Sequence, residues 1–362
     1  MVVETFEQQK MKTEKLRIAF VGSVGVPNRY GGFEAFLEHC GPEIAKEVSE
    51  VLVTCDASAY QEDQSRDFQG MKRIFVPIKA NGGSSIFHDA FAFLKVFKQS
   101  SHIFFLGVSG GLWFPIFRLM CDLSGKKIIV NIDGVEWRRS KFGKFKRLIL
   151  RLLDGMSQIF AHKIIYDNEG LRAYILRPYV SKSSLIAYPG DYVQKISGVQ
   201  MQKGHALTIC RIEPENNLDI LIEGALNSKL DLYTVVGNWN HSPYARNLRE
   251  KYRGQPKIRL LDPIYDATKL AELRQSCEIY LHGHSVGGTN PSLVEMLFYD
   301  CRILCFDVDF NRFTTDNELE YFKSSEDLVQ IISMQKGNMS SRDNLRKRYS
   351  RSEIVRKYLA LV

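Results

Sequence analysis

The stretch HGHSVGGTNPSLVEMLFYD, residues 282–300, says most about the fold and the function of this chain. The segment EIYL at 278–281 precedes it and predicts the end of a strand, and Pro291 predicts the first turn of an amphipathic helix. The glycine pair lets a ligand approach the backbone, and the N–H groups of a helix start attract phosphate. Glu295 is suited to accept hydrogen bonds from a ribose diol.

This combination predicts an anionic, sugar-bearing ligand such as a nucleotide sugar, with an ordinary strand-to-helix turn as the alternative. The candidate substrate-binding residues of the stretch are His284, Gly288, Thr289, Asn290, Ser292 and Glu295.

Apolar runs and segments of helical periodicity alternate along the whole chain. This alternation predicts an α/β protein with doubly wound parallel sheets. Strands are expected at 16–24, 51–54, 73–77, 102–108, 127–132, 163–166, 205–210, 231–236, 257–261, 278–281 and 302–306. Helices are expected at 33–46, 85–98, 167–176, 217–227, 242–253, 267–276, 324–334 and 350–361.

The pattern loosens into polar, glycine-containing sequence around 188–203, which predicts a linker. We expect two Rossmann-like domains, an N-terminal one over 1–195 and a C-terminal one over 203–345. A helix within 346–362 ends the chain, and it either docks elsewhere or crosses back to the N-terminal domain. Because ligands bind at the carboxyl ends of the strands in such sheets, a central cleft faced by both domains is the expected site.

The composition describes a soluble globular protein: 362 residues, 44% hydrophobic and 25% charged. No apolar run is long enough for a transmembrane helix, and residues 1–16 lack the apolar core of a signal peptide. The seven cysteines are scattered and form no CxxC pair, which favours reduced thiols in a cytoplasmic protein.

Most of the formal net charge of +8 falls in the first 200 residues. It concentrates in WRRSKFGKFKRLILRLLD, residues 137–154, where seven basic residues precede the single acid Asp154. Interleaved aromatic and aliphatic residues make this segment a candidate basic amphipathic helix that lies on an anionic membrane surface. A solvated basic face on a packed helix is the alternative. Nucleic acid is not expected as a partner, because no nucleic-acid module accompanies the patch.

Two loops of the N-terminal half carry candidate site residues. The first strand is followed by YGGFE rather than GxGxxG, so Gly31, Gly32 and Glu34 at a helix start are candidates for facing a diphosphate. A structural Gly-Gly turn is the alternative. The strand at 127–132 ends in DGVEW, where Asp133 and Glu136 are candidate proton acceptors for a sugar hydroxyl.

Trp137 of the same loop offers a flat apolar surface on which a carbohydrate stacks. The alternative makes Asp133 a helix cap and Trp137 a core residue.

Arg211 follows the strand at 205–210 in the C-terminal half. A guanidinium there is bidentate and always charged, which makes it a natural partner for a diphosphate. A surface ion pair with Glu213 or Glu215 is the alternative.

Six motifs taken together closely resemble family 4 glycosyltransferases of the GT-B architecture, and within them the bacterial rhamnosyltransferases that assemble cell-wall and capsular polysaccharides. In chain order they are YGGFE, NIDGVEW, RIEPENN, VVGNW, LLDPIYD and HGHSVGGTNPSLVE. The resemblance spans essentially the whole chain. It implies that Gly31 and Gly32 approach the donor phosphates, that Arg211 pairs with the diphosphate, and that Glu295 holds the donor ribose.

The chain departs from the family pattern at three places. Gly287 stands where the first Glu of the E-x7-E signature is usual, and Asn217 stands where a Lys usually follows the diphosphate Arg. The acceptor-side His of the family is not evident, and Asp133 occupies the comparable strand end.

The resemblance implies a retaining, metal-independent hexosyltransferase without a cofactor, in which Asp133 and Arg211 are the catalytic residues. It would move L-rhamnose from dTDP-rhamnose onto a lipid-linked saccharide at the inner face of the plasma membrane. A sugar-nucleotide epimerase of the same architecture is one alternative. A non-catalytic nucleotide-sugar-binding protein is another, and it would account for Gly287 and Asn217. A dehydrogenase is disfavoured by the missing GxGxxG.

Overall fold

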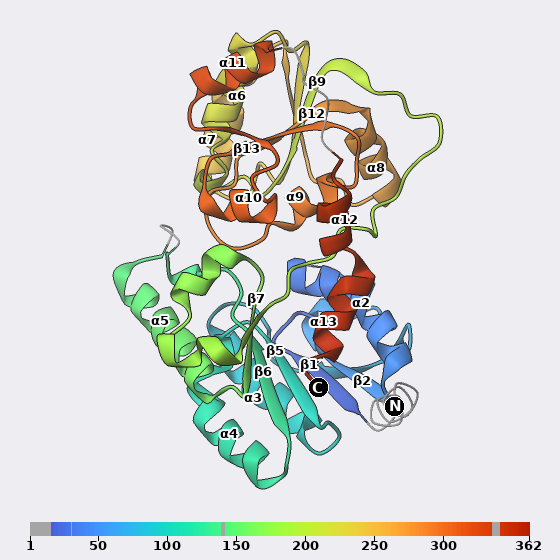
Figure 1. Cartoon of the computed structure of the whole chain (residues 1–362), viewed down its shortest axis with the longest axis vertical. Helices are drawn as coiled ribbons and strands as arrows, with labels where there is room; N and C mark the ends of the chain where they lie inside the picture. Colours follow the sequence, from blue (N-terminus) through green and yellow to red (C-terminus); the bar gives the residue numbers. More distant parts are fainter. Residues whose placement is uncertain (1–15, 30, 139–141, 335–340) are drawn as a thin grey trace. The chain divides into compact units, whose positions relative to one another are not determined.

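The computed structural model describes residues 16–29, 31–138, 142–334 and 341–362. The chain forms two compact units. Unit 1 consists of Met1–Pro189 together with Arg351–Val362, and unit 2 of Gly190–Ser350. Each unit is a twisted, mostly parallel sheet covered by helices, as Figure 1 shows.

The sheet of unit 1 has the strand order β3-β4-β2-β1-β5-β6-β7-β8. All neighbouring strands pair in parallel except β3 and β4. The strands are β1 (Arg17–Val21), β2 (Glu50–Asp56), β3 (Asp67–Phe68), β4 (Met71–Val76), β5 (His102–Leu106), β6 (Lys127–Asn131), β7 (Lys163–Tyr166) and β8 (Ser183–Leu185). The helices are α2 (Gly32–Glu47), α3 (Ser85–Phe97), α4 (Phe114–Leu123), α5 (Lys144–Phe160) and α13 (Arg351–Leu359), with the 3-10 turns η3 (Ser109–Trp113), η4 (Glu136–Arg138) and η5 (Glu169–Tyr174) among the connections.

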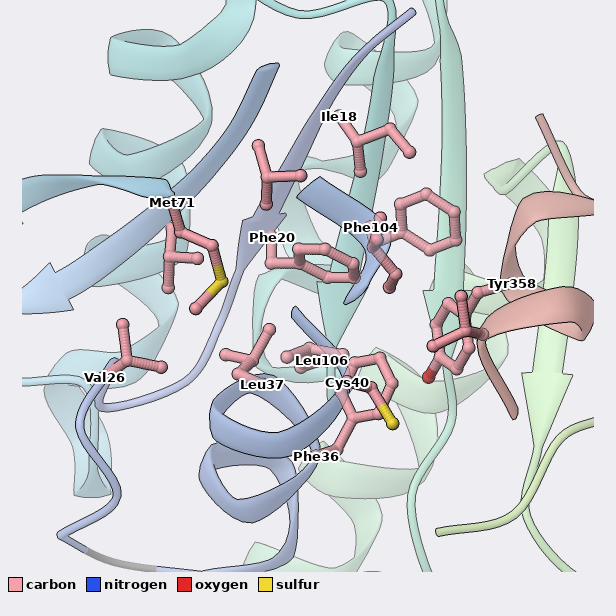
Figure 2. Close-up of a cluster of buried hydrophobic side chains, with 14 of the residues drawn as sticks. Ile18, Phe20, Val26, Phe36, Leu37, Cys40, Met71, Phe104, Leu106 and Tyr358 are labelled. Carbon is pink, nitrogen blue, oxygen red and sulfur yellow. The ribbon is translucent and has the colours of Figure 1, made fainter. Parts of the chain in front are cut away.

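One core of unit 1 lies between the sheet and helices α2 and α13. The rings of Phe36 and Tyr358 stack there with centroids 4.4 Å apart, and Phe20 and Phe104 pack beside them (Figure 2). A parallel sheet is buried on both faces, which is why its strands are near-continuous apolar runs in the sequence. Helix α13, near the end of the chain, therefore completes the core that β1 and α2 form near its start.

The sheet of unit 2 is fully parallel, with the strand order β11-β10-β9-β12-β13-β14. Its strands are β9 (Gln202–Ile209), β10 (Leu232–Val236), β11 (Ile258–Leu261), β12 (Cys277–His282), β13 (Arg302–Phe306) and β14 (Glu320–Phe322). Its helices are α6 (Leu218–Asn227), α7 (Pro243–Lys251), α8 (Ala267–Ser276), α9 (Pro291–Met296), α10 (Asp309–Thr314), α11 (Ser325–Ser333) and α12 (Asp343–Arg348). The order reverses between β9 and β12, which gives the sheet one topological switch point.

The doubly wound α/β architecture with two Rossmann-like sheets is confirmed, but several short elements were missed and two local predictions are wrong. Helices α4, α10 and α12 and strands β3, β8 and β14 were not expected. The segment predicted as a helix at 167–176 is the 3-10 turn η5. The basic helix begins at Lys144 rather than at Trp137, because Gly143 is extended at its N-cap; residues 139–141 of the basic segment lie outside the described residues.

Within the described ranges, no helix combines the length and the hydropathy that crossing a membrane requires.

Candidate functional site

The switch point of unit 2 lies between strands β9 and β12, which pair directly. Ligands of open α/β sheets bind outside the carboxyl ends of the strands at such a point. The two loops that start there, residues 210–217 and 283–290, are called the switch-point loops below. They contain Arg211 and the glycine-rich part of the most informative sequence stretch.

The two switch-point loops are joined to each other by hydrogen bonds. The Ser285 N–H donates to the Glu215 carbonyl over 2.9 Å, and the Asn217 side-chain amide donates to the Gly283 carbonyl over 2.8 Å. A Cβ on Gly283 would lie 2.1 Å from the carbonyl oxygen of Asn216, so only glycine permits this approach. The loops are therefore held at a fixed spacing by the protein alone.

Arg211 is exposed on the first loop, two residues after the end of β9. Its guanidinium makes no hydrogen bond or ion pair with the described part of the chain. The alternative ion pairs are not formed: the Glu213 carboxylate lies 3.3 Å from Nε2 of His241 instead. Meanwhile the Asn216 amide donates to the Arg211 carbonyl over 2.7 Å and fixes the backbone. An unpaired cation on a fixed backbone is suited to bind a phosphate.

Two histidines stand at the end of β12. Nδ1 of His284 lies 3.0 Å from Oδ1 of Asn216, and the Asn311 amide donates to the His284 carbonyl over 2.8 Å, so His284 is positioned from both sides. His282 is 4% exposed, and burial lowers its pKa to about 3. At neutral pH, His282 is therefore an uncharged side chain next to the second switch-point loop.

Glu295 on α9 has both carboxylate oxygens engaged. Arg274, at the end of α8, donates to Oε2, and the hydroxyl of Tyr192 donates to Oε1. Arg274 is only 9% exposed, so the two charges compensate each other in a mostly buried place. Each carboxylate oxygen keeps a second lone pair for a further donor such as a ribose hydroxyl.

Sequence reasoning missed Arg274 and Tyr192. They stand 21 and 103 residues from Glu295 in the chain, and no motif links the three positions.

The sequence predicts that N–H groups at the start of α9 are open to a phosphate, and the structure differs from this prediction. The helix has only six residues, and the side chain of its N-cap residue Asn290 already accepts from the Ser292 N–H over 2.9 Å. Thr289 is 5% exposed. Gly287 has a φ of 108°, a conformation that glycine adopts without strain. Asn290 is therefore a helix cap, and the Ser292 N–H is not open to a phosphate.

In unit 1, Gly31 and Gly32 open α2, a helix of 16 residues, as predicted from the sequence. Glu34 in its first turn is 3% exposed, and its Oε1 accepts from the Val24 N–H over 2.7 Å. Burial raises the pKa of the Glu34 carboxyl, while hydrogen bonds from the backbone at Val24, Glu34 and Gly31 act in the opposite direction. The structure therefore makes Glu34 an anchor of the β1–α2 loop, and the expected contact with a ligand does not fit its burial.

Asp133 follows β6 with a φ of 56°, an uncommon conformation for a residue other than glycine. Its N–H donates to Oδ1 of Asn131 over 3.1 Å, which fixes the turn. Glu136 is half-buried one short turn further on, in η4. Buried Tyr188 has its pKa raised by burial first and then by the charges of Asp167 and Asp133, so two carboxylates lie near its ring.

Trp137 packs against α5 instead of standing open. Its indole N–H donates to Oδ2 of Asp154 over 3.1 Å, and the Arg151 guanidinium lies 5.2 Å from the ring centroid. Tyr174 meets the ring edge-on at 5.9 Å. One side of the ring is therefore committed to packing, but Trp137 is only half-buried and does not belong to the buried core.

No group of three or more His, Cys, Asp or Glu side chains is arranged for a metal ion in residues 16–29, 31–138, 142–334 and 341–362.

Residues 15–191 match the family described as a domain of unknown function, DUF1972. None of the curated proteins compared with the chain matches it in sequence. Solved structures that resemble it include a sucrose-phosphate synthase from Thermosynechococcus elongatus, at a TM-score of 0.70 and 12% identity over 96% of this chain and 94% of that one. The fold is GT-B.

Two further structures share this fold. The catalytic domain of starch synthase IV from Arabidopsis thaliana, bound to ADP and acarbose, aligns at a TM-score of 0.63 and 10% identity over 96% of this chain and 98% of that one. The lipopolysaccharide outer core galactosyltransferase WaaB, in its apo form, aligns at a TM-score of 0.61 and 12% identity over 96% and 99%.

Proposed function

We propose that this protein is a glycosyltransferase that moves a sugar from a nucleotide-sugar donor to a saccharide acceptor. The observation that carries the proposal is the exposed, unpaired guanidinium of Arg211 at the switch point of unit 2. The GT-B fold supports it, as does a neighbour of the same fold bound to ADP and acarbose. In a parallel sheet of this order, a phosphate at that place is the expected ligand of such a residue.

The proposed reaction breaks the bond between the sugar C1 and the diphosphate oxygen and forms a bond from C1 to an acceptor hydroxyl oxygen. The nucleoside diphosphate leaves with the bonding electrons, and Arg211 stabilises its growing negative charge. Asp133 accepts the proton of the acceptor hydroxyl, with Glu136 beside it as a substrate-binding residue. The N–H groups at Gly31 and Gly32 approach the donor phosphates.

Glu295 is proposed to bind the donor ribose, because Tyr192 and Arg274 fix its carboxylate and leave lone pairs for hydroxyl donors. His284 and Gly288, on the second switch-point loop, are proposed to line the donor site, with Thr289 beside them. Asn290 and Ser292 support this loop through the helix cap.

The finer identity of the substrates rests on the sequence resemblance. We propose dTDP-rhamnose as the donor, a lipid-linked saccharide as the acceptor, and a retaining reaction that needs neither a metal ion nor a cofactor. The protein would then work in the cytoplasm at the inner face of the plasma membrane. The expected product is a bacterial surface polysaccharide.

Thermal unfolding with a panel of dTDP-, UDP- and GDP-sugars tests the donor site. A ligand that binds only the folded state raises the melting temperature, and we expect the largest shift with a dTDP-sugar. Arg211→Ala should weaken donor binding by roughly tenfold or more, because a charge-assisted hydrogen bond contributes about 1.5–3 kcal/mol. Arg211→Lys should retain part of the shift.

Arg253→Ala is the matched control, because Arg253 is exposed on the same unit just after α7 and outside the switch-point loops. If Arg211→Ala responds to the sugars as strongly as Arg253→Ala, the proposed donor site is wrong.

The geometry of Asn217 favours a non-catalytic nucleotide-sugar-binding protein as the second candidate. Asn217 adopts a φ of 48° and uses its amide to hold the Gly283 carbonyl, so this position supplies no positive charge to a leaving group. Such a protein would show the thermal shift without turnover. Release of free nucleoside diphosphate, measured with lipid-linked saccharides and with water as acceptors, separates the two candidates.

A further inference from the structure

Two neighbouring helices of unit 1 expose apolar side chains at the same helical spacing. On α3, Phe87, Phe91 and Leu94 are 59%, 41% and 57% exposed. On η3 and α4, the spacing i, i+4, i+7, i+11 repeats, with exposed fractions of 50% to 81% for Leu112, Ile116, Leu119 and Leu123. Such a spacing places the side chains of each helix in one stripe. The opposite sides of both helices are already buried, so these stripes are additional to the core.

The first turns of α5 continue this surface. Phe145, Leu148, Ile149 and Leu152 are 37% to 77% exposed, again on one side of the helix. Helix α4 packs against α5, η3 contacts both α3 and α5, and the rings of Phe87 and Trp113 lie 6.4 Å apart. Figure 1 shows α4 and α5 next to each other at the edge of unit 1, away from α2 and α13. The exposed stripes of these three connected helices are called the apolar face below.

The charges around this face are almost all positive. Its exposed cations are Lys95, Lys98, Lys144, Lys146, Arg147 and Arg151. Of the three acidic residues on α3, η3, α4 and α5, Asp89 and Asp154 are buried. The third, Asp122, pairs with Arg118 and His162. The surface thus combines large exposed apolar side chains with a one-sided positive charge.

We propose that this face, formed by the exposed residues of α3, η3, α4 and the first turns of α5, docks onto a bilayer that contains anionic phospholipid. Apolar side chains of this kind insert at the boundary of headgroups and acyl chains, and surrounding cations bind anionic headgroups. A second copy of the chain is a poorer occupant. A symmetric dimer through this face would bring the same cations of both copies together, whereas an anionic bilayer neutralises them.

The proposal extends the membrane part of the proposed function from one basic helix to a three-helix surface whose apolar side chains do most of the binding. Only the biological reason for membrane binding, access to a lipid-linked acceptor, rests on the proposed function. Binding to vesicles that hold no donor and no acceptor therefore tests it separately from any sugar transfer.

Co-sedimentation of the full chain with vesicles of equal parts phosphatidylglycerol and phosphatidylcholine is the experiment. The double variant Leu119→Ser/Leu123→Ser removes two exposed side chains that lie outside the basic segment. We expect it to lower vesicle affinity by about tenfold or more at both low and high salt, because salt does not screen apolar insertion. Lys144→Gln/Lys146→Gln should lower affinity mainly at low salt, where the attraction to anionic lipid is strong.

Met201→Ser/Tyr265→Ser is the matched control, since both residues are large, apolar and exposed but belong to unit 2. It should sediment like the unmodified protein, and phosphatidylcholine vesicles should bind less of every variant. Two results overturn the proposal. One is unchanged sedimentation of Leu119→Ser/Leu123→Ser. The other is a dimer in vesicle-free solution that this variant dissociates, which would show that a second copy covers the face.

Discussion

At the scale of single residues, the proposed donor site of unit 2 contains two charges in opposite situations. Arg211 is left unpaired, while Glu295 is fully paired with Arg274 and Tyr192. A charge without a protein partner is available to a ligand, whereas a paired and mostly buried one keeps its position. This division is the physical basis of the proposed roles, phosphate binding for Arg211 and donor binding for Glu295.

Removing Arg274, the charged partner of Glu295, should lower the free energy of unfolding of unit 2. Arg274→Met leaves a mostly buried carboxylate uncompensated, and we expect it to destabilise unit 2 by about 3–5 kcal/mol. The double variant Arg274→Met/Glu295→Gln removes the orphaned charge and should recover a large part of that loss. Chemical denaturation followed by a unit 2 signal measures both. Equal stability of the single and the double variant would mean that the pair does not matter energetically.

His282 should make unit 2 less stable in mild acid. Burial lowers its folded-state pKa to about 3, below the unfolded value of roughly 6.5, so only the unfolded chain takes up the proton as the pH falls between these values. From about pH 7 to about pH 5 this uptake costs about 2 kcal/mol. Gln at position 282 cannot titrate. Between pH 7 and pH 5 the free energy of unfolding of His282→Gln should therefore fall less than that of the unmodified protein, by about 2 kcal/mol. Parallel pH curves for the two proteins would contradict the assignment.

At the scale of elements, the position of α5 is set by one glycine. A Cβ on Gly111 in η3 would lie 2.2 Å from the carbonyl oxygen of Leu153, whereas a Cβ on Gly155, two residues further along α5, meets nothing within 4 Å. The backbones of η3 and α5 therefore touch where the helix leaves its exposed first turns. This contact holds the apolar face of α5 beside that of α4.

The two glycines should respond to alanine with opposite signs. Gly111→Ala must push α5 away and should cost about 1–3 kcal/mol, the usual range for overpacking. Gly155→Ala should instead stabilise unit 1 by roughly 0.5–1 kcal/mol, because alanine loses less backbone entropy in a helix. Thermal unfolding of the two variants beside the unmodified protein distinguishes them. If both changes destabilise, α5 is not packed as described.

At the scale of the whole molecule, the chain leaves unit 1 after Pro189, builds unit 2, and returns to unit 1 at Arg351. Ile354, Val355, Tyr358 and Leu361 of this return belong to the same core as β1, β5 and α2. Lys163 also donates to the carbonyl of Leu361 over 2.8 Å. The last residues of the chain are thus a structural part of unit 1.

Truncating Tyr358 should loosen unit 1 and leave unit 2 intact. Its ring is 3% exposed, and Tyr358→Ala should cost about 3–5 kcal/mol, as expected for a large buried aromatic. Hydrogen exchange should quicken in β1, β5 and α2 and stay unchanged in β9 and β12. Lys347→Ala, an exposed change just before the return, is the control. Faster exchange in both units after Tyr358→Ala would show that α13 supports more than its own core.

The sequence by itself determined the architecture of this protein, because its signals are local. Apolar runs of about five residues predicted the buried parallel strands, and the Gly31-Gly32 pair predicted the start of α2. The position of Arg211 at a strand end followed from the same rhythm. Each of these features is encoded within one turn or one strand, so a few neighbouring residues are enough to predict it.

The tertiary structure alone decided which distant groups meet. It paired Glu295 with Arg274 and Tyr192, committed Asn290 and Glu34 to holding their own loops, and packed Trp137 on α5. It also returned the end of the chain to unit 1 and left the outer stripes of α3 and α4 uncovered. These outcomes depend on packing between elements that lie many tens of residues apart in the chain. Patterns over a few neighbouring residues do not predict such contacts.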